Sequence, residues 1–164
     1  MRFLVFILGI VLCISCETKS TMQNDFDCET ISIHNSETVE DVKGLFSLAI
    51  PNHWEINLYE DAMQSSIFTA DTTKQLTKTV LLDVTLVENS IQFDEAFELK
   101  QEQEYLLNKL IKIKSKTFKV AEKPALYMLF KGKKGKFNYQ ICNTFIQLNT
   151  KQFIVAKAEV YGDS

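Results

Sequence analysis

Glycine, histidine and proline are scarce in this chain of 164 residues, which contains five glycines, two histidines and two prolines. Loops that wrap phosphate groups depend on glycine, and neither a P-loop nor the glycine fingerprint of dinucleotide-binding proteins occurs. The histidines, His34 and His53, have no metal-ligand neighbour at helical or turn spacing. The sequence therefore gives no support for a nucleotide, a metal ion or another cofactor.

Familiar catalytic motifs are also missing, since the sequence contains neither HExxH nor GxSxG. Adjacent carboxylates such as Asp94 and Glu95 occur, but any chain of this size has such pairs, and these two suit the start of a helix. An enzyme would require distant carboxylates or histidines that meet in a cleft. We therefore predict that the protein is not an enzyme.

The chain opens with Met1, Arg2 and the apolar run FLVFILGIVL. A basic start followed by an apolar run shorter than the ~20 residues of a membrane span is typical of an export signal. Cys13-Ile14-Ser15-Cys16 follows and resembles a bacterial lipobox, with small Ser15 before Cys16, although Cys13 stands where such boxes usually carry leucine. An ordinary cleaved secretion signal is the alternative interpretation.

The lipobox resemblance implies a signal peptide over residues 1–15 and a palmitate-bearing Cys16 that anchors a lipoprotein in a bacterial membrane. The protein would then belong to the cell envelope, on the periplasmic side or at the surface. Residues 16–43 have few apolar residues and no periodicity, so we expect a lipidated N-terminus and a flexible tether. The folded domain is predicted over residues 44–164.

Short apolar and β-branched runs fill the domain on both sides of one helical segment. They are LFSLAIP, HWEINLYE, SSIFTAD and TVLLDVTLVE before that segment, and KIKSKTFKVA, ALYMLFKG, FNYQICNTFIQL and QFIVAKAEVY after it. Short turns between consecutive strands indicate antiparallel neighbours, because parallel pairing needs a longer crossover. We predict an α+β fold with an antiparallel sheet and a long central helix on one face.

The helix is predicted over Phe93–Lys112 from the recurrence of apolar residues at mostly three- and four-residue spacing. The predicted core-facing stripe comprises Ala96, Leu99, Leu106 and Leu110, with Phe93, Phe97, Leu107 and Ile111 beside them. Glu98, Gln101, Glu102 and Asn108 are left for solvent. Acidic residues at the start and lysines at the end suit the helix dipole.

Of the four cysteines, Cys13 leaves with the signal and Cys16 takes lipid, so Cys28 and Cys142 remain as a candidate pair. Export makes a disulfide chemically allowed. Cys142, however, lies in a predicted strand and is equally well explained as a small buried apolar residue. The pairing is therefore left open.

Charge is unevenly distributed along the chain. Residues 17–108 contain 5 lysines and 18 acidic residues, a net charge of −13, whereas residues 109–136 contain 10 lysines and one glutamate, a net charge of +9. The hairpin lysines Lys131, Lys133, Lys134 and Lys136 are candidates for contact with an anionic partner, such as lipid headgroups or an acidic protein. Alternatively, lysines along an exposed strand protect a sheet edge from pairing. The overall acidity and the export signal argue against nucleic acid.

A strand ending at Pro51, Trp54 three residues later, a long helix starting near residues 91–97 and the Pro124-Ala125 step before a strand resemble the Mog/PsbP-like fold. That group includes PsbP, a small Ran-binding protein and bacterial DcrB-like lipoproteins. The resemblance, over about residues 44–161, implies a helix–sheet–helix sandwich whose members mostly bind or assemble without catalysis. Members usually end in a further helix. We expect that C-terminal helix to be missing here, which would leave one sheet face less covered.

Together these observations predict a membrane-anchored lipoprotein that serves as a non-catalytic binding or assembly module for an envelope protein. The alternative is a periplasmic carrier of a small apolar ligand, since aromatic residues are numerous enough to line a cavity. A large cavity would favour the carrier, and a filled core would favour the assembly module.

Overall fold

The computed structural model describes residues 21–28 and 35–162. Its contacts divide the chain into two units, Met1–Ile31 and Ser32–Ser164. In the first unit the described residues form the short helix α1 (Thr21–Phe26), which lies in the predicted tether. The predicted signal peptide and Cys16 lie outside the described residues. None of the helices formed by the described residues is both long and apolar enough to span a membrane.

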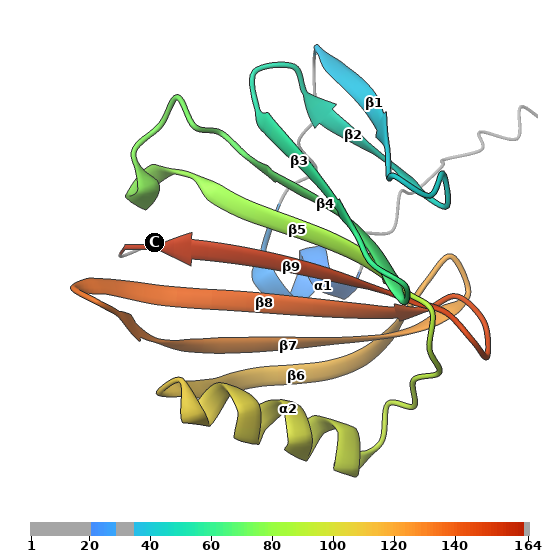
Figure 1. The fold of residues 1–164 in the computed structure, drawn as a ribbon. Helices are drawn as coiled ribbons and strands as arrows, with labels where there is room; N and C mark the ends of the chain where they lie inside the picture. Colours follow the sequence, from blue (N-terminus) through green and yellow to red (C-terminus); the bar gives the residue numbers. More distant parts are fainter. Residues whose placement is uncertain (1–20, 29–34, 163–164) are drawn as a thin grey trace, which may run out of the picture. The chain divides into compact units, whose positions relative to one another are not determined.

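The second unit is built on a seven-stranded antiparallel sheet (Figure 1). Its strands are β3 (Glu55–Glu60), β4 (Gln64–Ala70), β5 (Val80–Val87), β6 (Leu110–Val120), β7 (Lys123–Lys134), β8 (Phe137–Gln147) and β9 (Phe153–Tyr161). Their spatial order is β3-β4-β5-β9-β8-β7-β6. The last strand therefore lies in the middle of the sheet and joins its two halves. Because β9, β8 and β7 separate β5 from β6, the chain crosses between these strands through a helix, α2.

A separate two-stranded sheet precedes the large one and is formed by β1 (Ser36–Glu40) and β2 (Ser47–Pro51). The prediction that residues up to 43 form a flexible tether was wrong for this segment, and the folded unit begins before residue 44. The carboxylate of Asp41 organises the β1–β2 turn by accepting hydrogen bonds from the backbone N–H groups of Leu45 and Phe46 at 2.6 and 2.8 Å. A polar strand and an acidic turn residue give no apolar run, which is why the sequence pattern does not indicate them.

Helix α2 (Glu95–Leu107) has 13 residues and is shorter than the helix predicted over Phe93–Lys112. Asp94 caps its start, because its carboxylate accepts a hydrogen bond from the Phe97 backbone N–H at 2.8 Å. At the other end Lys109 has a φ of 60°, and Leu110 already begins β6. The prediction of helix over Leu110–Lys112 was wrong because these residues pair with β7, and sheet pairing overrides the local helical pattern.

The predicted apolar stripe of α2 is only partly confirmed, because Phe93 and Phe97 pack against the core whereas its leucines face solvent. Leu99 and Leu106 are 55% and 58% exposed, and Leu107 is 86% exposed. Glu98, which was predicted to face solvent, instead accepts a hydrogen bond from the Ser115 hydroxyl of β6 at 2.7 Å. The helix is therefore rotated about its axis relative to the prediction, so that Phe97 and Tyr105 face the sheet and Glu98 and Glu102 face Ser115 and Lys112 of β6.

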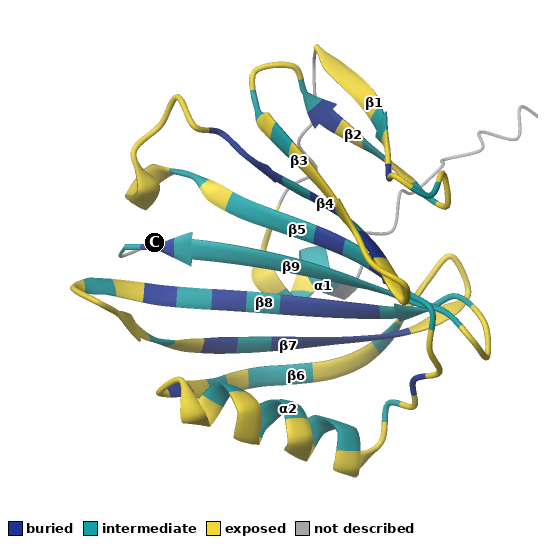
Figure 2. Ribbon diagram, viewed as in Figure 1, coloured by how far each residue is buried: buried dark blue, intermediate teal, exposed yellow. Residues whose placement is uncertain are grey.

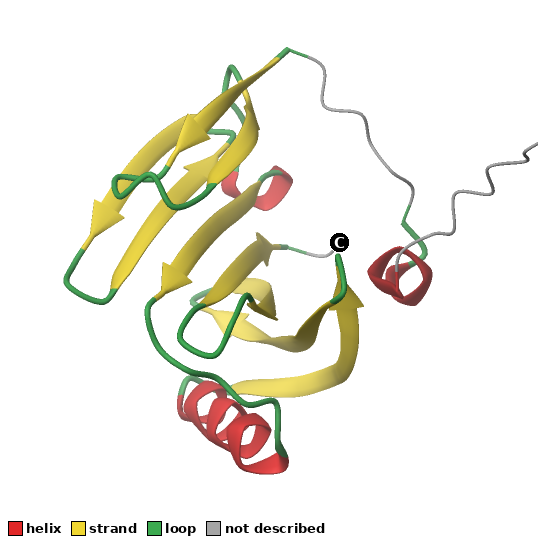
Figure 3. Ribbon diagram, turned by 90° about the vertical axis from the view of Figure 1, so that its right-hand side faces the viewer, coloured by secondary structure: helices red, strands yellow, loops and turns green. Residues whose placement is uncertain are grey.

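Aromatic side chains attach α2 to one face of the sheet. The Tyr105 ring stacks on Phe130 of β7 with 4.2 Å between centroids, and the Phe97 ring meets Phe145 of β8 edge-on at 5.0 Å. Such aromatic pairs contribute beyond the area they bury. The expectation that a helix packs on one face of the sheet is thus confirmed, with the helix at the β6 end (Figures 1 and 3).

The core lies beneath α2 and continues along the central strands (Figure 2). Its buried members are Ile91, Leu110, Leu126, Met128, Phe130, Tyr139, Ile141, Phe145 and Tyr161. Leu126, Met128 and Phe130 are 0% exposed, so the space under the helix is filled by side chains. Within residues 35–162 no helix follows β9. A filled core is the outcome that favours an assembly module over a carrier.

Candidate functional site

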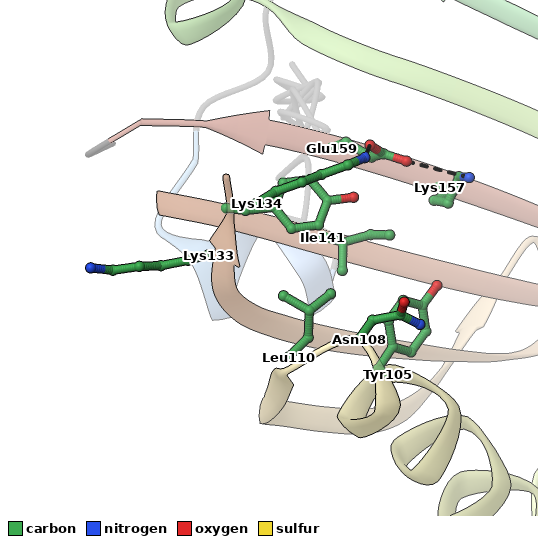
Figure 4. A pocket seen from close by; sticks show the side chains of 9 residues that line it. Tyr105, Asn108, Leu110, Lys133, Lys134, Ile141, Lys157 and Glu159 are labelled. Atoms are coloured by element: carbon green, nitrogen blue, oxygen red, sulfur yellow. Dashed lines mark ion pairs between the residues drawn. The ribbon is translucent and has the colours of Figure 1, made fainter. Parts of the chain in front are cut away.

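A groove opens beside the C-terminal end of α2, on the face of the sheet that the helix covers in part (Figure 4). Its volume is about 280 Å³. The lining residues are Tyr105 and Asn108 from α2, Leu110 from β6, Lys133 and Lys134 from β7, Tyr139 and Ile141 from β8, and Lys157 and Glu159 from β9. We call this site the tyrosine groove.

Ion pairs hold three charged side chains of the tyrosine groove, those of Lys134, Lys157 and Glu159. Glu159 lies between two lysines, with its carboxylate oxygens 3.8 Å from Lys134 Nζ and 3.4 Å from Lys157 Nζ. Lys157 Nζ also lies 3.6 Å from Asp83 Oδ2 on the neighbouring strand β5. The register explains this arrangement, because Asp83 is directly opposite Lys157 in the ladder. The groove thus presents alternating charges held on rigid strands.

The Lys134 side chain lies over two tyrosine rings. Its ammonium nitrogen lies 5.0 Å from the Tyr139 ring centroid and 5.5 Å from that of Tyr161, which is a cation–π arrangement. Hydrogen bonding to Tyr161 and the negative charge of Glu159 raise the pKa of Lys134, outweighing the opposing effect of burial. Lys134 therefore remains charged well above neutral pH.

The tyrosine hydroxyls are held in their neutral form. Burial raises the pKa of Tyr139, and hydrogen bonding to Glu159 raises it further. Burial also raises the pKa of Tyr105, whose hydroxyl oxygen accepts a hydrogen bond from Asn143 Nδ2 at 2.7 Å. General acid–base catalysis at neutral pH needs a group that titrates near pH 7, and these shifts move both tyrosines and Lys134 away from it. The arrangement suits recognition of polar and charged groups more than proton transfer.

Comparison with known proteins shows the fold of this unit. No protein-family model and no curated protein matches the sequence. Among solved structures, the Ran-binding protein Mog1p of Saccharomyces cerevisiae is similar with a TM-score of 0.52 and 16% identity, over 79% of this chain and 78% of that one. A mutant of Mog1 gives a TM-score of 0.53 and 15% identity over 80% of each chain. Cyanobacterial PsbP from Synechocystis sp. gives 0.53 and 13% identity, over 81% of this chain and 84% of that one.

The chain has a Mog1/PsbP-like fold. The resemblance expected from the order of strands and helix is thus confirmed at the level of the fold. At these identities the likeness carries no residue of a Mog1 or PsbP site over to this chain. The site of the Mog1/PsbP-like domain therefore has to be argued from its own side chains.

The hairpin lysines of the Mog1/PsbP-like domain do not form one surface. Lys134 points into the tyrosine groove, and Lys133 lines both this groove and a second one, which Lys131 also lines. Lys136 lies over the Phe137 ring at 5.3 Å from its centroid. The alternation of side chains along β7 separates neighbours in sequence. Their role in binding a partner stays a prediction.

The candidate cysteine pair does not form a disulfide in this structure. Cys28 is an exposed free thiol, and Cys142 is a half-buried free thiol on β8. Burial raises the pKa of the Cys142 thiol, which makes it less reactive at neutral pH. The pairing itself stays a prediction.

His53 lies close to the carboxylate of Asp71, which is far from it in sequence. His53 Nε2 lies 3.4 Å from Asp71 Oδ2, and Lys74 Nζ lies 3.0 Å from the same oxygen. Hydrogen bonding from the Thr73 hydroxyl and from Lys74 lowers the pKa of Asp71 to about 2. A carboxylate this acidic stays ionised near neutral pH, so it is suited to hold the turn after β4 rather than to accept a proton.

Sequence analysis missed Lys157 and Glu159 as site residues. A signal was present in the run FIVAKAEVY, where two charged residues occur two positions apart in an otherwise mostly apolar strand. Residues two apart in a strand share a face. The two charges therefore had to lie together on one face of β9, but the sequence does not show that β9 is central or that Lys134 faces it.

Proposed function

We propose that this protein is an exported lipoprotein of a bacterial envelope, and that its Mog1/PsbP-like domain binds a protein partner through the tyrosine groove. It is proposed to act as a non-catalytic assembly module. The observation that carries this proposal is the alternating charge array of Lys134, Glu159 and Lys157 over buried tyrosines.

Three features support a protein partner. The groove offers both signs of charge at fixed positions, which is how charged side chains of a partner are selected. Tyrosine at the floor supplies rigid amphipathic contact area, and tyrosine is enriched at protein interfaces. A protein of the same fold, Mog1p, is a Ran-binding protein. The N-terminal sequence from Met1 to Cys16 supports export and lipid anchoring.

Replacing both Lys134 and Lys157 by methionine is expected to abolish capture of the partner. Methionine keeps much of the apolar side chain but leaves Glu159 without its two cationic neighbours. The measurement is a pull-down from detergent-solubilised envelopes with the full-length protein, followed by mass spectrometry of co-purified proteins and extracted lipids. We expect one stoichiometric protein with the unmodified chain and at least tenfold less with the double variant, because each lost charge pair costs on the order of 1 kcal/mol.

The matched control is Lys151→Met, which removes one exposed lysine from the β8–β9 turn, outside the groove lining. It should capture the partner like the unmodified protein. Undiminished capture by the Lys134→Met, Lys157→Met variant would show that the partner binds elsewhere. Recovery of a small apolar molecule without any protein would instead favour the carrier.

Lipid anchoring is expected to depend on Cys16 alone. In cells grown with labelled palmitate, the protein should carry label and sediment with membranes, and Cys16→Ala should lose both properties. Cys28→Ala, which changes a cysteine in the predicted mature chain, should keep them. Label that persists after Cys16→Ala would rule out the proposed lipoprotein.

A further inference from the structure

A second groove is lined by the α2–β6 connection, the start of β6 and the neighbouring parts of β7 and β8, and lysine supplies all of its charge. Its volume is about 640 Å³, and its charged lining residues are Lys109, Lys131 and Lys133. Gly132 brings Lys109 close to the other two, because a Cβ atom on Gly132 would lie only 2.5 Å from the Lys109 carbonyl oxygen. Glycine thus permits the close approach of the α2–β6 connection to β7. We call this site the lysine groove.

The lysines of the lysine groove lack the ion pairs that hold other lysines of the domain. Lys112 pairs with Glu102 at 2.8 Å and Lys134 with Glu159 at 3.8 Å. By contrast, no carboxylate of residues 21–28 or 35–162 forms an ion pair with Lys109, Lys131 or Lys133. Three unpaired ammonium groups in one concave surface create a positive potential that attracts anions.

One exposed aliphatic side chain lines the lysine groove, and two more lie two and three residues before Lys109 in the chain. Leu106 and Leu107 end α2 and are 58% and 86% exposed, and Ile111 in the groove lining is 54% exposed. Lysines together with protruding aliphatic groups match a phospholipid surface, because the lysines reach anionic headgroups while the aliphatic groups enter the boundary with the acyl chains. A purely acidic protein surface would satisfy the lysines and leave the exposed Ile111 side chain in water.

We propose that the lysine groove and the exposed end of α2 form a membrane-contact surface that binds anionic phospholipid. This contact is independent of a lipid on Cys16, because all of its residues belong to the second unit. It also differs from the protein-binding role of the tyrosine groove.

The test uses a fragment of residues 32–164, which corresponds to a unit with its own core and lacks both Cys16 and the apolar leader. Binding is measured by sedimentation with vesicles of phosphatidylcholine alone and with vesicles of phosphatidylcholine and phosphatidylglycerol in equal amounts. We expect binding to the phosphatidylglycerol vesicles, a marked loss of this binding as salt is added, and little binding to phosphatidylcholine alone.

Three variants separate the contribution of the groove lysines to vesicle binding from that of the leucines and from that of charge alone. Lys109→Gln with Lys131→Gln and Lys133→Gln should weaken binding about 100-fold, at about fivefold per lysine. Leu106→Ser with Leu107→Ser should weaken it about tenfold at unchanged charge. The control is Lys119→Gln with Lys123→Gln and Lys151→Gln, which removes the same charge from residues outside both grooves and should lower binding by much less. Thermal melting by circular dichroism verifies that each variant is folded.

The proposal is overturned if the unmodified fragment does not bind phosphatidylglycerol vesicles at low salt, or if the groove and control triple variants weaken binding equally. Retention on an acidic protein without binding to vesicles would also overturn it and would identify the lysines as a protein-docking surface. Because the fragment carries no lipid and the variants leave Lys134 and Lys157 unchanged, failure here is distinguishable from failure of the proposed protein-binding function.

Discussion

Replacing Phe130 by alanine is expected to lower the free energy of unfolding by about 3–5 kcal/mol. Phe130 is 0% exposed and stacks on Tyr105, so its removal leaves a cavity between β7 and α2 and also loses the aromatic contact that holds the helix. The measurement is urea denaturation followed by circular dichroism, in which the midpoint should fall while the slope stays constant.

Phe118→Ala is the matched control for Phe130→Ala. Phe118 lies on the edge strand β6, is only partly buried, and contacts Tyr127 with 5.8 Å between ring centroids. The same change of side chain should therefore cost clearly less there, on the order of 1–2 kcal/mol, because water can fill the vacated space. Equal losses in the two variants would contradict the packing of α2 through Phe130.

Replacing Asp41 by alanine is expected to destabilise the domain by about 3 kcal/mol, because hydrogen bonds to a charged acceptor are worth more than neutral ones. Asp41 is 4% exposed and its carboxylate accepts from the backbone N–H groups of Lys43, Leu45 and Phe46. Without it, these donors lose their partner and the β1–β2 turn loses its anchor. Urea denaturation at neutral pH measures the loss.

The effect of Asp41→Ala should also depend on pH. Burial alone would raise the pKa of Asp41, but the nearby Ser65 side chain and the hydrogen bonds from the backbone N–H groups of Phe46, Leu45 and Lys43 outweigh it and lower the pKa below its ordinary value of 3.8. A lowered pKa means that the charged form stabilises the folded state above pH 3.8 and that this contribution disappears as the pH falls further. The difference between the unmodified protein and Asp41→Ala should therefore narrow below pH 3.8. A stability difference between the two proteins that stays constant from neutral pH to pH 2 would contradict the charged hydrogen-bond network. The control is Glu37→Ala, which changes an exposed residue of β1 and should have little effect on stability at any pH.

The eight apolar runs that predict strands all form strands, because alternation and turn residues are properties of the local sequence. The antiparallel pairing of consecutive strands within the large sheet follows from the short turns in the same way, whereas the β5–β9 ladder joins strands that are far apart in the chain. The sequence does not predict β1, because its residues SETVE carry no apolar face. The turn that pairs β1 with β2 depends on the Asp41 carboxylate. The end of α2 was misplaced because Leu110, Ile111 and Lys112 fit both a helix and a strand, and only the partner strand β7 selects between them.

The candidate site was harder to predict from the sequence than the strands were. The lysines of the β7–β8 hairpin form a cluster in the sequence, yet β-strand alternation places Lys134 in the tyrosine groove, whereas Lys131 lines the lysine groove. The partners of Lys134 lie on β9, about 25 residues further along the chain, and no local pattern indicates that these strands present the same face to each other.

What the sequence determined by itself is local: eight strands, one helix with acidic residues at its start, antiparallel neighbours and a basic segment from Lys109 to Lys136. These follow from backbone geometry, side-chain periodicity and charge, which need no knowledge of distant contacts. Only the tertiary structure decided that β9 joins the two halves of the sheet, that β6 turns the glutamates of α2 inward and its leucines outward, and that Glu159 meets Lys134 and Lys157. Each of these depends on packing between segments far apart in the chain, where burial of Phe130, Phe145 and Tyr139 outweighs the local preference of any single segment.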